Sequence, residues 1–137
     1  MRDRDYKFFN VAREVAKLST WSEIPREQTG AVIVLRNEII ATGYNRCKGN
    51  FTHGWAAKMV NRPEAAYSHA ETSALHKASR LWMREPFELM KIYVYRETKE
   101  GLGIAKPCDI CTFALRHFGI QNVFYTTDNG YAEEIWK

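Results

Sequence analysis

Apolar positions recur along the chain with two different periods, and the first of these periods predicts helices. In residues 5–19 (DYKFFNVAREVAKLS) and 70–81 (AETSALHKASRL) apolar side chains return every three or four positions, as they do on one face of an amphipathic helix. The apolar positions are Phe8, Val11, Ala12 and Val15 in the first segment and Ala70, Ala74, Leu75, Ala78 and Leu81 in the second. A third helix is expected over residues 111–118, with Gly119 ending it in the left-handed conformation.

Other segments have the length and composition of β-strands: residues 29–35, 38–43, 90–95 and 121–127. The first two are joined by Arg36-Asn37 and predict a hairpin. The strand at 29–35 (TGAVIVL) is almost entirely apolar, so we expect both of its faces to be buried. Residues 131–136 (YAEEIW) follow the turn sequence DNG and are compatible with either a short strand or one helical turn.

The order of these elements is α, β, β, α, β, α, β, followed by the uncertain last segment. The strand at 90–95, the helix at 111–118 and the strand at 121–127 form a βαβ unit, which implies parallel strands and a right-handed crossover. Helices can then cover both faces of a mixed sheet. We therefore expect one α/β domain over residues 1–137, a three-layer sandwich with a mixed sheet of about five strands flanked by helices.

Residues 44–67 show neither period, and a loop of this length is usually functional or contains a short helix. The segment mixes aromatic residues with bases, Gly and Pro. Its basic side chains, Arg46, Lys48, Lys58 and Arg62, are candidates to meet a phosphate group or form a solvated surface. Its aromatic side chains, Phe51, Trp55 and Tyr67, are more often packing residues than platforms for a base.

Composition narrows the class of protein but does not identify a function. The chain has 137 residues, 45% of them hydrophobic, with no apolar run of the length that spans a membrane. Its N-terminal residues lack the apolar core of a signal peptide. Three cysteines are an odd number for a secreted disulfide framework, so we expect a soluble cytoplasmic protein. The net charge of +4 suits an anionic partner, but it is too modest to carry weight.

The segment KPCDIC places Cys108 and Cys111 three residues apart behind Pro107, a residue suited to a helix start. Both thiols are then expected on the first helical turn, on one side, where the helix N-terminus favours thiolates. Such a pair can hold a metal or form a redox disulfide. The redox motif of thioredoxin-like proteins follows an early strand, whereas this pair lies late in the chain, so the comparison favours a metal.

A metal needs at least a third ligand, and the chain has four histidines. His69 is expected at the first turn of the helix over 70–81, where two helix starts can face each other across a metal. His117 lies on the same helix as the cysteines and cannot turn back, His76 is expected to be exposed, and His53 lies in the long loop and is not placed.

Cys47 and Glu71 have two interpretations each. Cys47 is a free thiol, or a further ligand that closes the site or joins His53 in a second metal site. Glu71, two residues after His69, can reach a zinc-bound water, or it completes an S-x-x-E capping box with Ser68.

The combination His69-Ala70-Glu71 and Pro107-Cys108-Asp109-Ile110-Cys111 matches the H-x-E and P-C-x-x-C signature of zinc nucleobase deaminases. Further segments, among them TGAVIV, IIATGYN, IYVYRE and FGIQNVFY, resemble the deoxycytidylate deaminase branch of the cytidine deaminase superfamily over about Tyr6 to Tyr125. The resemblance implies that His69, Cys108 and Cys111 bind one Zn²⁺ per chain. It also implies that Glu71 is the catalytic proton carrier and that Asn45 and Ala70 contact the substrate.

The resemblance further implies hydrolysis of a cytosine nucleotide to the uracil nucleotide and ammonia, with dCMP as the favoured substrate, and assembly into a homo-oligomer. Single-stranded DNA or RNA and free cytidine or deoxycytidine are alternative substrates. A structural zinc module that only binds a partner is the alternative to an enzyme. Two departures leave the substrate open: Ser73 replaces a common Asn, and the residues after 125 are too few for the helix and parallel strand usual in that branch. A hairpin at DNG would instead be like the free-nucleoside branch.

Overall fold

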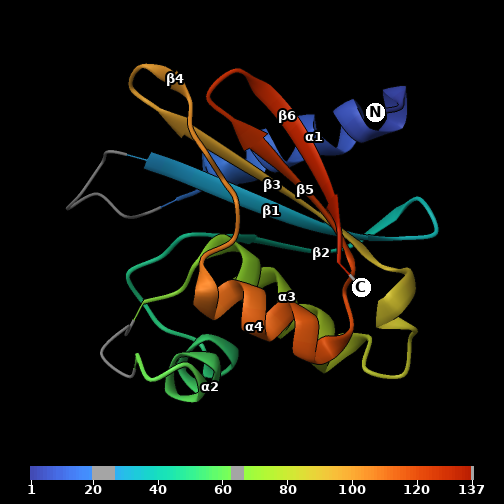
Figure 1. Cartoon of the computed structure of the whole chain (residues 1–137), viewed down its shortest axis with the longest axis vertical. Helices are drawn as coiled ribbons and strands as arrows, with labels where there is room; N and C mark the ends of the chain where they lie inside the picture. The colour runs from blue at the N-terminus through green and yellow to red at the C-terminus, as the bar shows by residue number, and fades with distance from the viewer. Residues whose placement is uncertain (20–26, 63–66, 137) are drawn as a thin grey trace.

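A mixed β-sheet with helices on both faces forms the body of the molecule (Figure 1). The computed structural model describes residues 1–19, 27–62 and 67–136. The strands are β1 Glu27–Leu35, β2 Glu38–Tyr44, β3 Lys91–Thr98, β4 Gly101–Leu102, β5 Asn122–Thr127 and β6 Gly130–Ile135. The helices are α1 Asp3–Ala16, α2 Phe51–Met59, α3 Ala70–Leu81 and α4 Asp109–Phe118, with a short 3-10 helix at Phe87–Leu89.

The strands are ordered β2-β1-β3-β5-β6, and β4 pairs with the end of β3. β3 and β5 are parallel and are connected through α4, which confirms the expected βαβ unit. All other pairs are antiparallel, including the β1–β2 hairpin. The three-layer α/β fold with a mixed sheet is therefore confirmed, with β4 and the 3-10 helix as elements that the pattern did not predict.

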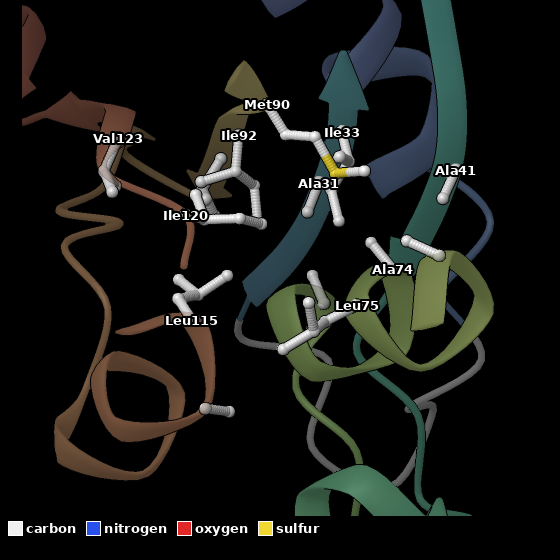
Figure 2. Packing of buried hydrophobic residues seen from close by; sticks show 14 of the residues in the cluster. Ala31, Ile33, Ala41, Ala74, Leu75, Met90, Ile92, Leu115, Ile120 and Val123 are labelled. Carbon is white, nitrogen blue, oxygen red and sulfur yellow. The ribbon is translucent and has the colours of Figure 1, made fainter. Parts of the chain in front are cut away.

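β1 is buried on both faces, as its apolar sequence predicted. Ala31, Ile33 and Leu35 belong to the hydrophobic cluster shared with α3 and α4. Val32 and Val34 belong to the cluster shared with α1 on the opposite face. Figure 2 shows the first of these clusters, in which Leu75 of α3 and Leu115 of α4 point toward the side chains of the sheet.

The buried side of α1 agrees only in part with the predicted one. Ala12 and Val15 are buried as predicted, whereas Val11 is exposed, Phe8 is only partly buried, and Phe9 is buried instead. The physical reason is the close approach of α1 to β1 at Gly30. A Cβ at Gly30 would lie 2.2 Å from the Ala12 carbonyl oxygen, so the helix presents its small residues here and turns Val11 outward.

α3 packs on the other face, and its first turn rests on β2. A Cβ at Gly43 would lie 2.4 Å from Ala74 N and 2.5 Å from Ala70 O, so β2 reaches the helix backbone itself. The predicted apolar side is buried except at Leu81, which is 74% exposed because it is the last residue of the helix.

The aperiodic region after β2 contains α2, the short helix that its length had suggested. Asn50 caps this helix by accepting a hydrogen bond from the His53 backbone N–H. α2 packs against α3 and α4 on the side away from the sheet (Figure 1). Residues 63–66 of the expected loop lie outside the described part of the chain.

The last segment is a strand, the first of its two predicted alternatives. β6 pairs antiparallel with β5, and Thr127 faces Gly130 across the turn at DNG. Gly119, at φ +101°, ends α4 in the left-handed conformation as expected. Among the described residues, no helix is both long and apolar enough to cross a membrane.

Candidate metal and active site

Two helix starts face each other and bring His69, Cys108 and Cys111 together. His69 is the N-cap of α3 and Cys108 is the N-cap of α4. The expectation that both thiols lie on the first turn of α4 is therefore wrong for Cys108. Its backbone is extended (φ −69°, ψ 177°), so the helix begins only at Asp109, and Pro107 lies outside it. His69 Nδ1 is 3.4 Å from Cys108 Sγ and 3.4 Å from Cys111 Sγ.

This geometry fits a zinc ion. Zinc bonds of about 2.0–2.3 Å in a tetrahedral arrangement separate neighbouring ligand atoms by roughly 3.6 Å. The two observed nitrogen–sulfur distances are close to that separation. Two thiolates and one imidazole are also ligand types that zinc prefers, and three protein ligands leave one position open.

His53 lies at the same site, which the sequence did not reveal. A ring nitrogen of His53, a ring nitrogen of His69 and Cys111 Sγ all lie within 4.8 Å of one another. His53 is 1% exposed, and burial lowers the pKa of its imidazole to about 4. The structure thus groups His53 with His69 rather than with Cys47, which is exposed, so it does not support the second metal site considered for Cys47 and His53.

Glu71 lies in the first turn of α3, and it is 6% exposed. Burial raises the pKa of the Glu71 carboxyl group above its ordinary value, although His69 beside it acts in the opposite direction. The capping box proposed for Ser68 and Glu71 is absent, because His69 is the N-cap and its side chain makes no capping hydrogen bond. Ser68 instead donates a hydrogen bond to Lys48 O. Glu71 therefore does not form the predicted pair with Ser68.

The protonation of the cysteines differs because their environments differ. A hydrogen bond from Cys111 lowers the pKa of Cys108 to about 4, with burial opposing and His69 adding to the effect. Burial raises the pKa of Cys111. For His69, burial lowers the pKa, but the hydrogen bond to Cys108 and the nearby Glu71 carboxylate raise it above the ordinary value. Cys108 thus offers a thiolate at neutral pH, the form in which cysteine binds metals.

A cavity of about 150 Å³ opens beside these groups and is lined by His69, Ala70, Glu71 and Cys108. Asn45 also lines it. In the structure the Asn45 side-chain amide is bonded to β1, accepting from Thr29 N at 3.1 Å and donating to Glu27 O at 3.4 Å. The structure therefore brings the proposed metal-binding, proton-carrying and substrate-contacting residues to one place, with Asn45 fixed in the wall of the cavity.

The cations at the cavity are not those expected from the sequence. None of Arg46, Lys48, Lys58 and Arg62 lines it. Arg96 of β3 and Lys106, just before α4, line it instead. Arg96 is paired with Glu27 and donates to Ile104 O, while Lys106 Nζ lies 3.1 Å from Glu134 Oε2. No local sequence pattern predicts that Arg96 and Lys106 line one cavity, because the segment that contains β4 separates them in the chain.

The fold and the two facing helix starts, carrying H-x-E and P-C-x-x-C, define the class of zinc nucleobase deaminases. The chain belongs to the family described as the cytidine and deoxycytidylate deaminase zinc-binding region, which matches residues 2–127.

One curated protein is similar to this chain in sequence. ComE operon protein 2 of Bacillus subtilis (strain 168) is 29% identical over 125 residues, which are 88% of this chain and 60% of that protein. The chain thus spans about 60% of the length of that curated relative.

Two solved structures show the same fold at low sequence identity. Cytidine deaminase from Burkholderia pseudomallei is 17% identical with a TM-score of 0.65, covering 98% of this chain and 93% of that one. The apo dCMP deaminase of cyanophage S-TIM5 is 16% identical with a TM-score of 0.61, covering 93% and 86%.

Proposed function

We propose that this protein is a zinc-dependent deaminase that converts a cytosine nucleotide, dCMP before others, to the uracil nucleotide and ammonia. The observation that carries the proposal is the position of Glu71. Its buried carboxyl group lines the same cavity as His69 and Cys108, so a proton carrier and metal-binding groups face one small space.

In this proposal His69, Cys108 and Cys111 hold one Zn²⁺ per chain, with His69 bound through Nδ1. Zinc supplies a water molecule whose pKa is lowered toward ~7 and which is therefore a nucleophile at neutral pH. The proposal includes a location in the cytoplasm, because both cysteines must stay reduced to bind the metal.

Glu71 moves the proton. Its carboxylate takes a proton from the attacking water and delivers it to N3 of the cytosine ring as the oxygen bonds to C4. Glu71 then takes the proton of the new C4 hydroxyl group and delivers it to the amino group, which leaves as ammonia as the C4–N4 bond breaks and the C4 carbonyl forms. A pKa raised by burial suits this task, because a group that both accepts and releases a proton works best near the ambient pH. Ala70 and Asn45 form the wall against which the base lies.

Free cytidine or deoxycytidine is the second candidate substrate, and the antiparallel β5–β6 pair favours it. This arrangement replaces the parallel strand expected for the deoxycytidylate branch. The two candidates are therefore distinguished by whether the reaction depends on the phosphate group of the substrate.

The test compares dCMP, CMP, deoxycytidine, cytidine and a cytosine-containing oligonucleotide by ammonia release from the zinc-loaded protein. We expect kcat/KM for dCMP to exceed that for deoxycytidine by about 10-fold or more, the effect of one charge-assisted phosphate contact. Lys106 at the cavity is the proposed source of that contact. Lys106→Met should therefore remove most of the preference, whereas Lys48→Met, outside the cavity, should leave it intact.

Equal rates for dCMP and deoxycytidine would assign the protein to free nucleosides. Preferential reaction of the oligonucleotide, weakening steeply with salt, would assign it to single-stranded nucleic acid. A protein that binds zinc but deaminates none of these compounds would be a structural zinc module, and the deaminase proposal would fail.

We also propose that the chain forms a homo-oligomer. Phe51 and Met83 are 79% and 69% exposed, and both line an apolar cavity of about 860 Å³ formed by α2, α3 and α4. Contiguous exposed apolar surface of this kind commonly marks an interface. Light scattering on the purified protein tests the proposal, and a monomer at micromolar concentration would contradict it.

A further inference from the structure

His53 presents a buried nitrogen without a partner at the edge of the metal site. Its Nδ1 lies 2.8 Å from Thr72 Oγ1, but its Nε2 is buried and has no hydrogen-bond partner in the described part of the chain. A buried polar atom left unpaired costs free energy, so such atoms in native proteins usually have a role. The centre of the His53 ring lies 4.7 Å from that of the His69 ring, which indicates that the role of this nitrogen concerns His69.

The hydrogen bonds of Thr72 favour one position of the His53 proton. The Thr72 hydroxyl group is within hydrogen-bond distance of His69 O (3.3 Å) and of His53 Nδ1 (2.8 Å). When the hydroxyl group donates to His69 O, it accepts from His53, and the neutral ring carries its proton on Nδ1. His53 Nε2 is then a buried lone-pair acceptor, on a ring that lies beside His69 and Cys111.

His69 needs such an acceptor when it binds zinc. Its Nδ1 is the atom close to both sulfurs, so its Nε2 carries the remaining ring hydrogen. A metal-binding histidine almost always donates its second ring N–H to a neighbouring group, which fixes the ring and strengthens the ligand.

We propose that His53 is a positioning residue of the metal centre, whose Nε2 accepts a hydrogen bond from the Nε2–H of His69 in the zinc-loaded protein. The inference rests on the proposed zinc site and deepens it. It links α2 to the start of α3 through a chain that runs from His69 Nε2–H to His53 and from His53 Nδ1–H to Thr72.

The cavity argues against the alternative that His53 is itself a fourth ligand. In a zinc centre held by His69, Cys108 and Cys111, the open position would face the cavity with Glu71, because His69, Cys108 and Glu71 all line it. His53 does not line the cavity. It therefore lies where it can support His69 but not where it would displace a water molecule.

The experiment measures zinc affinity by competition with a chromophoric chelator, and ring protonation by long-range ¹H–¹⁵N NMR. His53→Asn is the informative variant, because the Asn amide can still donate to Thr72 from near the position of Nδ1 but lacks Nε2. We expect zinc affinity to fall about 10- to 100-fold, the range for loss of such a support. We also expect the slowly exchanging His69 Nε2–H signal of the wild type to be lost.

Two further variants separate this role from general packing. His53→Gln places an amide oxygen near the position of Nε2 and should recover part of the affinity and the signal. His76→Ala removes another histidine that contacts a threonine, Thr52 at 3.0 Å, and should bind zinc like the wild type.

Unchanged zinc affinity in His53→Asn would overturn the inference, as would a wild-type ¹⁵N spectrum in which His53 Nε2 is bound to zinc. A wild-type protein that binds no zinc would overturn the proposed function as well. A protein that shows the predicted zinc and NMR changes but deaminates nothing would lose only the proposed function.

Discussion

The structure removes one of the two interpretations that the sequence allowed for Glu71. The residue is buried and lines the cavity, and the capping box that it was predicted to form with Ser68 is absent. At the scale of single residues, the catalytic and structural effects of changing Glu71 are therefore separable.

Glu71→Gln should abolish most turnover while it preserves the fold and the zinc. Gln has nearly the same shape as Glu but cannot accept and release a proton, so kcat should fall by roughly 10²–10⁴. Ammonia release, zinc content and melting curves measure the three properties, and Glu88→Gln, at an exposed position of the 3-10 helix, is the matched control. If the Glu71→Gln variant kept more than about a tenth of the wild-type activity, another group would have to move the proton.

At the scale of elements, the contact between β2 and α3 sets the position of the site. The main chain of the first turn of α3 lies against Gly43, and that turn follows His69 directly. A side chain on Gly43 would push the helix start, and with it His69 and Glu71, away from the sheet.

Gly43→Ala should therefore lower both the free energy of unfolding and the zinc affinity. The added methyl group meets main-chain atoms that cannot rotate away, and overpacking of this kind costs about 1–3 kcal/mol. Gly54→Ala, in α2, is the control, because a Cβ there has nothing within 4 Å. It should raise the free energy of unfolding by roughly 0.5–1 kcal/mol through helix propensity. Urea unfolding measures both, and equal effects of the two changes would contradict the explanation.

The elements themselves were largely predictable, and the exceptions have physical causes. The pattern of apolar positions identified α1, α3, α4 and the strands β1, β2, β3 and β5, because those elements bury one or both faces. It left β6 open between a strand and a helical turn. In α1 it identified Ala12 and Val15 correctly but not Phe9, since the close approach at Gly30 is a tertiary effect. β4 is too short to show a period, and α2 has its buried side against other helices rather than the sheet.

The candidate site was predictable where residues are linked by a local motif and not where the fold brings them together. His69, Glu71, Cys108 and Cys111 belong to two short motifs, so they could be named in advance. His53, Arg96 and Lys106 reach the site from α2, β3 and the segment before α4, and no local spacing joins them to it. The signal for His53 is its burial, which the sequence pattern around it does not show.

At the scale of the whole molecule, we expect zinc to stabilise the fold, because its proposed ligands come from two helices that the sheet holds together. Binding to the native state alone adds about 4 kcal/mol when free zinc exceeds Kd by about 1,000-fold. A chelator should therefore lower the wild-type melting temperature.

Cys108→Ser and Cys111→Ser should lose the zinc and melt at the same temperature with or without the chelator. Cys47→Ser should behave like the wild type, because Cys47 is exposed and lies outside the site. Scanning calorimetry with metal analysis measures these outcomes. A wild-type protein whose melting temperature is unaffected by the chelator would show that metal binding and stability are not coupled here.

The order of strands in the sheet also bears on when the metal can be captured as the chain folds. β1 pairs with its neighbour β2 through a two-residue turn, but its other partner is β3, in a register that sets Glu27 opposite Thr98. Pairing β1 with β3 closes a long loop, and the entropy lost in closing it is compensated only when the distant contacts form. This pairing therefore belongs to the slow part of folding. His69 precedes β3 and Cys108 follows it, and the two meet only once β3 is in place. Zinc should therefore bind after the rate-limiting step of folding. Its presence should leave the folding rate unchanged and slow only the unfolding of the native protein.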